Sequence, residues 1–312
     1  MAQNVAQSPA AVRRPGAAAS PPGPSLWQRM RRNAWGYLFV LPWVVLYLAF
    51  GIYPLLLSFY LTFFNYSFTN PGALEFVGVG NWIRGLFDPL FWRSLFNITY
   101  NQVIFIVLKN LLGLAVALLL KQALKGGRIF RTIYFMPVVT SVVVLMTIGQ
   151  YLASPGGPIQ NILHINVFWQ STVWLPMPVI AFINTWKWFG ISTVIFLAGL
   201  LAIDQQLYEA ASLDGAGAWD SFLSITLPQL RPQIFFLLVV DLINGLQMFT
   251  EVFTLYDLGG GAYHQALTPV LYLYGQAFGE SNIGYASVLG LLLALIIGIL
   301  TVLQFRFFRT ES

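Results

Sequence analysis

Residues 284–305 read GYASVLGLLLALIIGILTVLQF, a long run with no Asp, Glu, Lys or Arg. A helix needs about 20 apolar residues to cross the roughly 30 Å of hydrocarbon in a bilayer. Apolar stretches of comparable length precede this run at about 35–59, 96–120, 130–153, 177–201 and 233–253. The sequence therefore predicts an all-α membrane protein with six transmembrane helices, in which residues 35–312 form one membrane domain.

The composition agrees with a membrane protein. Of the 312 residues, 57% are hydrophobic and 9% are charged, whereas about a quarter of the residues of a soluble domain are charged. Because the chain has no cysteine, it has no disulfide, no thiolate nucleophile and no cysteine-ligated metal. Residues 1–34 begin with a segment rich in Ala, Pro, Gly and Ser and end in a basic cluster, so we expect a disordered basic tail.

The positions of Lys and Arg predict which side of the membrane each end of the chain occupies. With six spans, most basic residues fall on one side, and Arg84 and Arg93 fall on the other. Cytoplasmic loops carry the excess of Lys and Arg, so both termini are expected in the cytoplasm. The charge is spread along membrane flanks and forms no single basic face, which argues against nucleic acid as a partner. The basic residues on the majority side are Arg13, Arg14, Arg29, Arg31, Arg32, Lys121, Lys125, Arg128, Arg131, Arg231, Arg306 and Arg309.

The predicted cytoplasmic loop at 202–232 reads AIDQQLYEAASLDGAGAWDSFLSITLPQLRP. Asp204 is a suitable N-cap and Gly215 a suitable stop, so a short helix, a turn and a second helix are expected. On pattern alone, an amphipathic linker lying on the bilayer surface is the simpler interpretation. However, such linkers are usually basic on their polar face, and this loop is mainly acidic.

Seven residues of this loop carry a resemblance to a known family. Their types and spacing match the pattern EAA-x3-G-x9-I-x-LP, which resembles the permease subunits of binding-protein-dependent ABC importers. Residues 197–219 and 274–287, with Trp186 and Lys187, are similar to the first permease of maltose-type and glycerol-3-phosphate-type systems. Asp204 and Ala262 depart from that pattern, since Pro is common at both places. The seven residues are Glu209, Ala210, Ala211, Gly215, Ile225, Leu227 and Pro228.

This resemblance implies a non-catalytic subunit in a bacterial or archaeal cell membrane, paired with a second permease as a heterodimer. The loop would dock on a separate ATPase subunit, which carries ATP and Mg, and no cofactor is expected on this chain. Glu209 would pair with an Arg of the ATPase, the two Ala residues would allow close packing, and Gly215 would set the turn. Ile225, Leu227 and Pro228 would brace the loop. An extracytoplasmic binding protein would deliver a sugar or a glycerol-3-phosphate-like substrate.

Polar residues inside the spans are the second set of candidates. On one helix, Asn244, Gln247 and Glu251 would share a face, with Asp241 beside it. A charge at mid-membrane costs roughly 2.5–3.5 kcal/mol on insertion scales, so such residues usually face a watery cavity or a partner. We expect these four residues and Lys187 to line the sugar path. Alternatively, Asp241 or Glu251 pairs with Lys187 or Lys109 and only holds the bundle together.

Two other classes of protein are alternatives to the importer. An ion-coupled secondary transporter would use Asp241, Glu251 and Lys187 as a relay, but it should show an inverted internal repeat, which the sequence lacks. An intramembrane enzyme would need a nucleophile with its base, or a cluster of metal ligands, at usable spacing. His164 and His264 are 100 positions apart and predict no metal site. The sequence does not identify the sugar.

Overall fold

The computed structural model describes residues 34–309, apart from 71, 73 and 122–126, so nearly all of the predicted tail lies outside the described residues. The chain divides into two units, 1–55 and 56–312. In the first unit, helix α2 (Ala34–Tyr47) continues through a π-helical turn (Leu48–Ile52) into α3 (Tyr53–Leu61), which runs on into the second unit.

Among the described residues, five helical segments are long and apolar enough to cross a membrane. They are Gly36–Leu61, Pro89–Lys121, Val142–Ile162, Pro176–Ala202 and Ile283–Phe307. A sixth span results if Ala218–Gln229 and Arg231–Gly245, which meet at an angle of 59°, count as one bent crossing. The structure therefore has five to six candidate spans, in agreement with the predicted membrane class.

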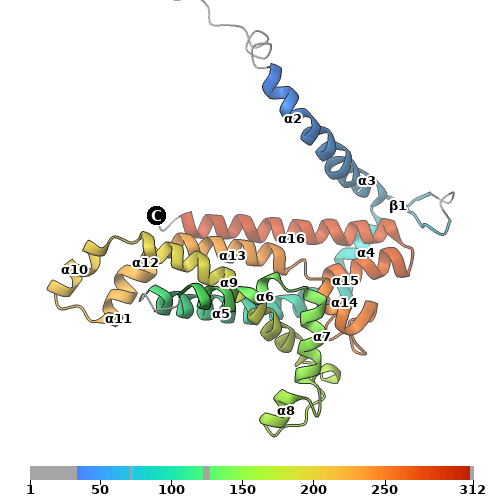
Figure 1. Ribbon diagram of the computed structural model, residues 1–312. Helices are drawn as coiled ribbons and strands as arrows, with labels where there is room; N and C mark the ends of the chain where they lie inside the picture. The colour runs from blue at the N-terminus through green and yellow to red at the C-terminus, as the bar shows by residue number, and fades with distance from the viewer. Residues whose placement is uncertain (1–33, 71, 73, 122–126, 310–312) are drawn as a thin grey trace, which may run out of the picture. The chain divides into compact units, whose positions relative to one another are not determined.

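Helices α5 (Pro89–Lys121) and α9 (Pro176–Ala202) pack against each other along much of the second unit. Gly113 allows their close approach, because a Cβ at this position would lie 2.5 Å from the Cβ of Ser192. The Ser192 hydroxyl donates a hydrogen bond of 3.1 Å to Oδ1 of Asn110 at the same crossing. Helix α16 (Ile283–Arg309) lies alongside α13 (Arg231–Gly245), as Figure 1 shows.

The single helix expected over 130–153 is corrected to two, α6 (Gly127–Val139) and α7 (Val142–Ala153). Lys187 of α9 explains the break, because its ammonium group donates hydrogen bonds to the carbonyls of Val138, at 3.1 Å, and Thr140. The last carbonyls of a helix have no partner within the helix, and a cation there also interacts favourably with the helix dipole. Lys187 thus stabilises the end of α6.

The single helix expected over 233–253 is also corrected, to α13 (Arg231–Gly245) and α14 (Thr250–Tyr256). At 1.5 Å per residue, the 15 residues of α13 span only about 22 Å. The loop between the two helices is held from outside, since the hydroxyl of Thr268 donates a 2.8 Å hydrogen bond to the carbonyl of Met248. A residue that follows both helices in the chain therefore stabilises the break.

The connecting elements are short. Strands β1 (Phe64–Asn65) and β2 (Glu75–Phe76) pair antiparallel, so the described part of this mostly helical chain also carries a small two-stranded sheet. The short helices are α4 (Gly80–Leu86), α8 (Pro158–Ile162), α10 (Gln205–Leu213), α11 (Ala218–Ser221), α12 (Leu227–Gln229) and α15 (Pro269–Tyr274). Single 3₁₀ turns occur at Trp169–Ser171 and Asp257–Gly259, and π-helical turns at Phe222–Thr226 and Gly275–Gly279.

Asp88 joins the start of α5 to α15 and α16. Its carboxylate accepts a 2.6 Å hydrogen bond from the hydroxyl of Tyr272 and another from the hydroxyl of Tyr285. Burial raises the pKa of Asp88, but these hydrogen bonds, together with those from the backbone N–H groups of Leu90 and Phe91, outweigh burial and hold the pKa below its ordinary value. Burial and the neighbouring carboxylate raise the pKa of Tyr272 to about 12. The junction therefore keeps its charged acceptor and its neutral donors at neutral pH.

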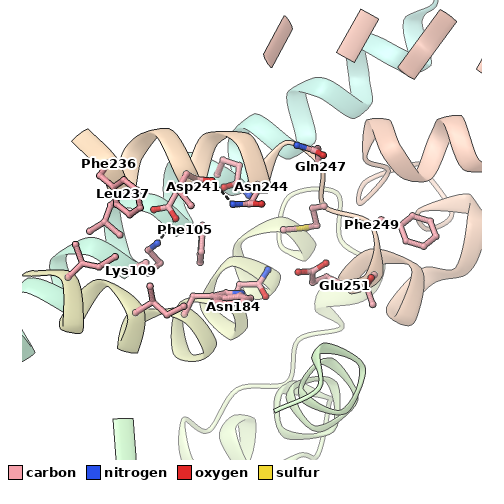
Figure 2. Close-up of a pocket in the computed structure, with 18 residues that line it drawn as sticks. Phe105, Lys109, Asn184, Phe236, Leu237, Asp241, Asn244, Gln247, Phe249 and Glu251 are labelled. Carbon is pink, nitrogen blue, oxygen red and sulfur yellow. Dashed lines mark hydrogen bonds and ion pairs between the residues drawn. The ribbon is translucent and has the colours of Figure 1, made fainter. Parts of the chain in front are cut away.

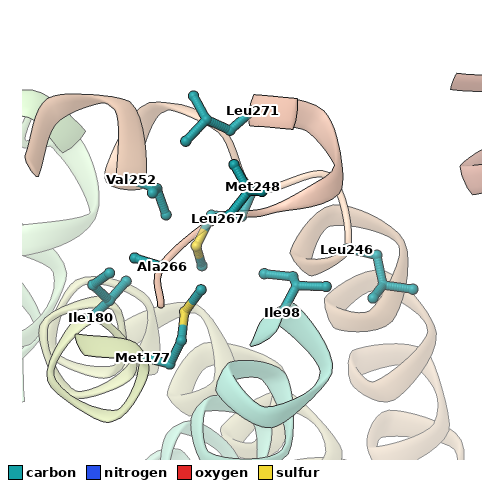
Figure 3. Packing of buried hydrophobic residues seen from close by; sticks show 9 residues of the cluster. All are labelled: Ile98, Met177, Ile180, Leu246, Met248, Val252, Ala266, Leu267 and Leu271. Carbon is teal, nitrogen blue, oxygen red and sulfur yellow. The ribbon is translucent and has the colours of Figure 1, made fainter. Parts of the chain in front are cut away.

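The largest apolar cluster fixes the region where α5, α9 and the segment after α13 meet (Figure 3). Ile98 of α5 and Ile180 of α9 are fully buried there with Val252 of α14. Within a membrane bundle, close van der Waals packing of such side chains, rather than their transfer out of water, holds the helices together. The cluster thereby anchors the loop between α13 and α14 and the start of α14 against the long helices. Its members are Ile98, Met177, Ile180, Leu246, Met248, Val252, Ala266, Leu267 and Leu271.

Candidate functional site

Residues 202–232 form an elbow of short helices, as the capping signals predict. The Asp204 carboxylate accepts a 2.9 Å hydrogen bond from the N–H of Gln206 and so caps α10. Gly215 ends the helix with φ of +81°, a conformation that glycine adopts without strain. Asp220 accepts a 3.1 Å hydrogen bond from the N–H of Gly217 and caps α11. The turn at Gly215 thus lies between α10 and α11, and the start of each of these helices is fixed by a capping hydrogen bond.

The elbow is fastened to the bundle by Tyr208, which the sequence analysis did not single out. Its hydroxyl shares a 2.8 Å hydrogen bond with the hydroxyl of Thr226, which is buried. The ammonium group of Lys121, at the end of α5, lies 4.4 Å from the centre of the Tyr208 ring. No periodicity in the sequence relates these three residues. They connect α10 to the base of its own elbow and to a long helix.

The predicted docking residues divide between the tip of the elbow and its base. Glu209, Ala210 and Gly215 are exposed, and Ala211 is half-buried. Ile225, Leu227 and Pro228 are half-buried where the elbow returns to α13. Two apolar side chains of the elbow are also strongly exposed, Leu213 at 89% and Trp219 at 69%. Large exposed apolar side chains grouped with an acid are typical of a contact surface.

In the second unit, α10, α11 and α12 lie at the same end as the C-terminal end of α16 (Figure 1). Helices α7, α8, α14 and α15 lie at the opposite end. If the long helices cross a membrane, the elbow and the C-terminal end of α16 therefore lie toward the same side of it.

A cavity of about 580 Å³ lies between α5, α9 and α13 (Figure 2). Asp241, Asn244, Gln247 and Glu251 all line it. They are not one stripe on one helix, however, because the break after Gly245 places Gln247 in a loop and Glu251 on α14. The chain brings the four predicted residues together by folding the loop and α14 around the cavity.

Asp241 has a partner within the chain. Its carboxylate forms an ion pair with Lys109 of α5, and both side chains are buried. Nδ2 of Asn110 donates a further hydrogen bond of 3.2 Å to the same carboxylate. The pairing that the sequence left open between Asp241 and Lys109 is thus present in the structure.

Lys187 does not line the cavity, although it was predicted beside the other polar residues. It is 3% exposed, and its ammonium group is directed to the carbonyls at the end of α6. Its contacts in this structure are therefore those of a helix cap.

Two buried amides complete the polar lining of the cavity. Gln102 of α5 and Asn184 of α9 are 5% and 3% exposed, and the side-chain oxygen of each has no hydrogen-bond partner in the described part of the chain. Gly245 makes room for Gln102, because a Cβ there would overlap the Gln102 amide. In the sequence, Gln102 and Asn184 stand out as polar residues inside apolar stretches. The stretches alone do not show whether these side chains face the cavity.

Metal-binding side chains do not cluster in the described residues, where no group of three or more His, Cys, Asp or Glu lies close enough to hold an ion. The chemistry that the cavity and the elbow offer is hydrogen bonding, ion pairing and apolar contact.

The sequence matches the family described as "Binding-protein-dependent transport system inner membrane component" over residues 109–310. The lactose transport system permease protein LacF of Rhizobium radiobacter is 34% identical, over 86% of this chain and 92% of its own length. The trehalose/maltose transport system permease protein MalF of Thermococcus litoralis is 31% identical, over 85% and 90%. The arabinooligosaccharides permease protein AraP of Bacillus subtilis is 30% identical, over 88% of each chain.

Solved structures share the fold. A chain of a bacterial ABC transporter that imports the acidic polysaccharide alginate superposes with a TM-score of 0.77 at 22% identity, covering 92% of this chain and 99% of that one. A chain of the bacterial alginate transporter in complex with a periplasmic protein bound to alginate pentasaccharide gives a TM-score of 0.74 at 23% identity, covering 89% and 95%. At these identities the likeness concerns the arrangement of the helices.

Proposed function

Because the chain belongs to the family of binding-protein-dependent transport system inner membrane components, we propose that it forms, with a second permease, the pathway of an ATP-driven sugar importer. It is a multi-pass, non-catalytic subunit of the inner membrane. The named relatives are permeases for lactose, trehalose or maltose, and arabinooligosaccharides, which supports a carbohydrate as the substrate. The alternative of an ion-coupled secondary transporter is rejected, because transporters of this family are driven by ATP hydrolysis on a separate subunit and not by an ion gradient.

The observation that carries this proposal is the exposed elbow. Its tip offers exposed acidic side chains, among them Glu209 and Asp214, together with small residues and exposed apolar side chains on a capped helix with a defined turn. An ATPase surface with an Arg and an apolar cleft would complement it, because an Arg–carboxylate pair adds directional hydrogen bonds to apolar contact. Tyr208 and Lys121 would pass a displacement of the elbow to α5.

The cavity is our candidate for part of the sugar path. Asn244 and Gln247 are exposed, and their amide groups donate hydrogen bonds to the carbonyls four residues earlier, those of Val240 at 2.9 Å and Ile243 at 2.7 Å. Their side-chain oxygens are left as acceptors for sugar hydroxyls. Glu251 adds a carboxylate, whereas Asp241 contributes through its pair with Lys109.

The remaining partners are proposed from the family. The second permease would complete the pathway, and two ATPase subunits would bind ATP and Mg. An extracytoplasmic sugar-binding protein would dock at the end opposite the elbow. In this arrangement both termini and residues 202–232 are cytoplasmic, residues 1–34 form a tail, and residues 35–312 form the membrane domain.

Substitution of Glu209 by Arg tests the docking role. The variant places a positive charge where the partner Arg is expected, so it should copurify at least about tenfold less ATPase, equivalent to about 1.4 kcal/mol. Since Glu209 is exposed, the permease itself should fold and insert as before. The measurement is the amount of ATPase recovered with tagged permease, together with sugar uptake by cells.

Glu280→Arg is the matched control, because Glu280 is also exposed but follows the π-helical turn after α15, at the opposite end. It should leave ATPase recovery unchanged. Full recovery of ATPase with Glu209→Arg, together with normal uptake, would show that the elbow is not the docking surface.

A further inference from the structure

A series of aromatic rings leads from the cavity to the loop that follows strand β1. Phe249 lines the cavity on the side of α14 (Figure 2), and its ring centre lies 5.0 Å from that of Tyr274 at the end of α15. The ring of Tyr274 lies 4.6 Å from that of Phe278, which in turn lies 6.1 Å from that of Phe68. Phe253 contacts both Phe249 and Tyr274, at 5.2 and 6.2 Å. We call these five residues the aromatic ladder.

The aromatic ladder is assembled from three separate parts of the chain. Phe68 belongs to the loop between β1 and β2, Phe249 and Phe253 to the segment that follows α13, and Tyr274 and Phe278 to α15 and the π-helical turn after it. A single π-helical turn is rare and is frequently found at a functional site. The rings therefore meet because the fold brings three segments together, and no single helix accounts for them.

Much of the aromatic ladder is open at the surface. Phe68 and Phe278 are 55% and 60% exposed, and Phe253 is 37% exposed. Exposed polar residues adjoin the rings farthest from the cavity, since Thr69 follows Phe68 and Glu280 lies two positions after Phe278. Because a carboxylate in hydrocarbon is strongly disfavoured, these surroundings fit a wet surface better than lipid tails. Exposed apolar area beside polar groups marks a place where a ligand or partner binds.

A saccharide chain has the chemistry that such a surface requires. Each sugar ring carries C–H groups on its faces, which can stack on an aromatic ring, and hydroxyl groups on its rim, which can hydrogen-bond to polar neighbours. Successive rings from Phe68 to Phe249 are 4.6–6.1 Å apart, a spacing on the scale of one sugar unit. The rings thus offer a series of stacking positions in place of one.

We propose that the aromatic ladder is a second saccharide-binding surface, which lies outside the cavity, takes chains of two or more sugar units and leads them to the cavity. This inference rests on the proposed function and adds a site to it. The aromatic ladder ends at Phe249 in the lining of the cavity, and this continuity favours a sugar over a helix of the second permease as its occupant.

The length of the sugar chain provides the test. The assembled transporter of both permeases and the ATPase is placed in nanodiscs without the binding protein, and saturation-transfer difference NMR titrations give the affinities for glucose, maltose and maltotetraose. Glucose is small enough for the cavity of about 580 Å³ alone. Maltotetraose can also stack on the aromatic ladder, so we expect the wild type to bind it at least about tenfold more tightly than glucose.

Three variants at exposed positions separate stacking from packing. Phe278→Leu removes a ring but keeps an apolar side chain, so it should weaken maltotetraose about fivefold and leave glucose unchanged. Phe278→Tyr keeps the ring and should bind both sugars as the wild type does. Phe182→Leu is the matched control, because Phe182 of α9 is also 60% exposed but belongs neither to the aromatic ladder nor to the cavity lining. It should leave every affinity unchanged.

Equal affinities for glucose and maltotetraose in the wild type would overturn the inference, as would wild-type binding of maltotetraose by Phe278→Leu. Loss of the second permease from purified Phe278→Leu, with unchanged sugar affinity of the intact complexes, would instead assign the aromatic ladder to the interface between the permeases. If Phe278→Leu does not assemble, Phe68→Leu in the exposed loop carries the same expectation. The proposed importer function is judged separately, by ATPase copurification with Glu209→Arg, which does not depend on sugar affinity.

Discussion

Replacing Lys109 by Met removes one partner of the buried ion pair and keeps a side chain of similar length. Asp241 is 7% exposed and would be left with a single hydrogen bond, from Asn110. Loss of one partner of a buried pair costs about 3–5 kcal/mol, because the remaining charge stays desolvated. For a domain of this size, each kcal/mol shifts the melting temperature by about 2–4 °C, so a fall of about 6–20 °C is expected.

The double variant Lys109→Met, Asp241→Leu should recover most of that loss. Both charges are then absent, and two apolar side chains occupy a site already enclosed by long helices. Replacement of a whole buried pair by apolar residues is often neutral or stabilising. Asn110 retains its hydrogen bond to the carbonyl of Ile106 at 2.9 Å and is not orphaned.

The assay is thermal unfolding of the purified transporter in nanodiscs, followed by intrinsic fluorescence, with sugar uptake measured in parallel. Lys121→Met, the same substitution at the end of the same helix, serves as the comparison: it loses only the cation–π contact with Tyr208, worth about 0.5–1 kcal/mol, and should lower the melting temperature by only about 1–4 °C. A melting temperature for Lys109→Met equal to that of the wild type would refute the reasoning, as would a double variant no more stable than the single one. Normal uptake by the double variant would assign Asp241 a structural role.

Three further perturbations have defined expected outcomes. Tyr208→Phe keeps the ring beneath Lys121 but deletes the hydrogen bond to Thr226; sugar taken up per ATP hydrolysed in proteoliposomes should fall, with ATPase copurification unchanged. Gly245→Ala forces a Cβ into the Gln102 amide and should cost about 1–3 kcal/mol by overpacking, visible as a lower melting temperature. Asp88→Asn should abolish an acid-dependent loss of stability. The folded-state pKa of Asp88 lies below its ordinary value, so the stability that its carboxylate contributes is complete above about pH 4 and is lost as the pH falls further. Melting temperatures of the wild type and the variant, measured over a series of pH values, would reveal this difference.

The sequence predicted the membrane class and the local geometry of the elbow, because both follow from short-range rules. Hydrophobic runs long enough to span a bilayer need no knowledge of neighbours. Likewise, Asp204 caps a helix through the N–H two residues ahead of it, and Gly215 ends the helix by its own φ. Such features are decided within a few residues of the chain.

The helix breaks and the cavity depend on residues far apart in the chain. Thr268 holds the loop at Met248, and Lys187 caps α6 at Thr140, so hydropathy predicted continuous helices at both places. Lys109 and Asp241 are separated by 132 positions. A pattern analysis could name these as possible pairs, but only the packing of α5 against α13 selects one of them.

The contact at Gly113 has a mechanical consequence. The backbone of α5 at Gly113 touches the Ser192 side chain of α9, so no free volume is left between the two helices in which they could slide. Protein interiors also resist compression. We therefore expect the two helices to move together as one rigid body in any conformational change of the permease. The pivot for that movement has to lie elsewhere, and the 59° corner before α13 is a place where the chain already turns.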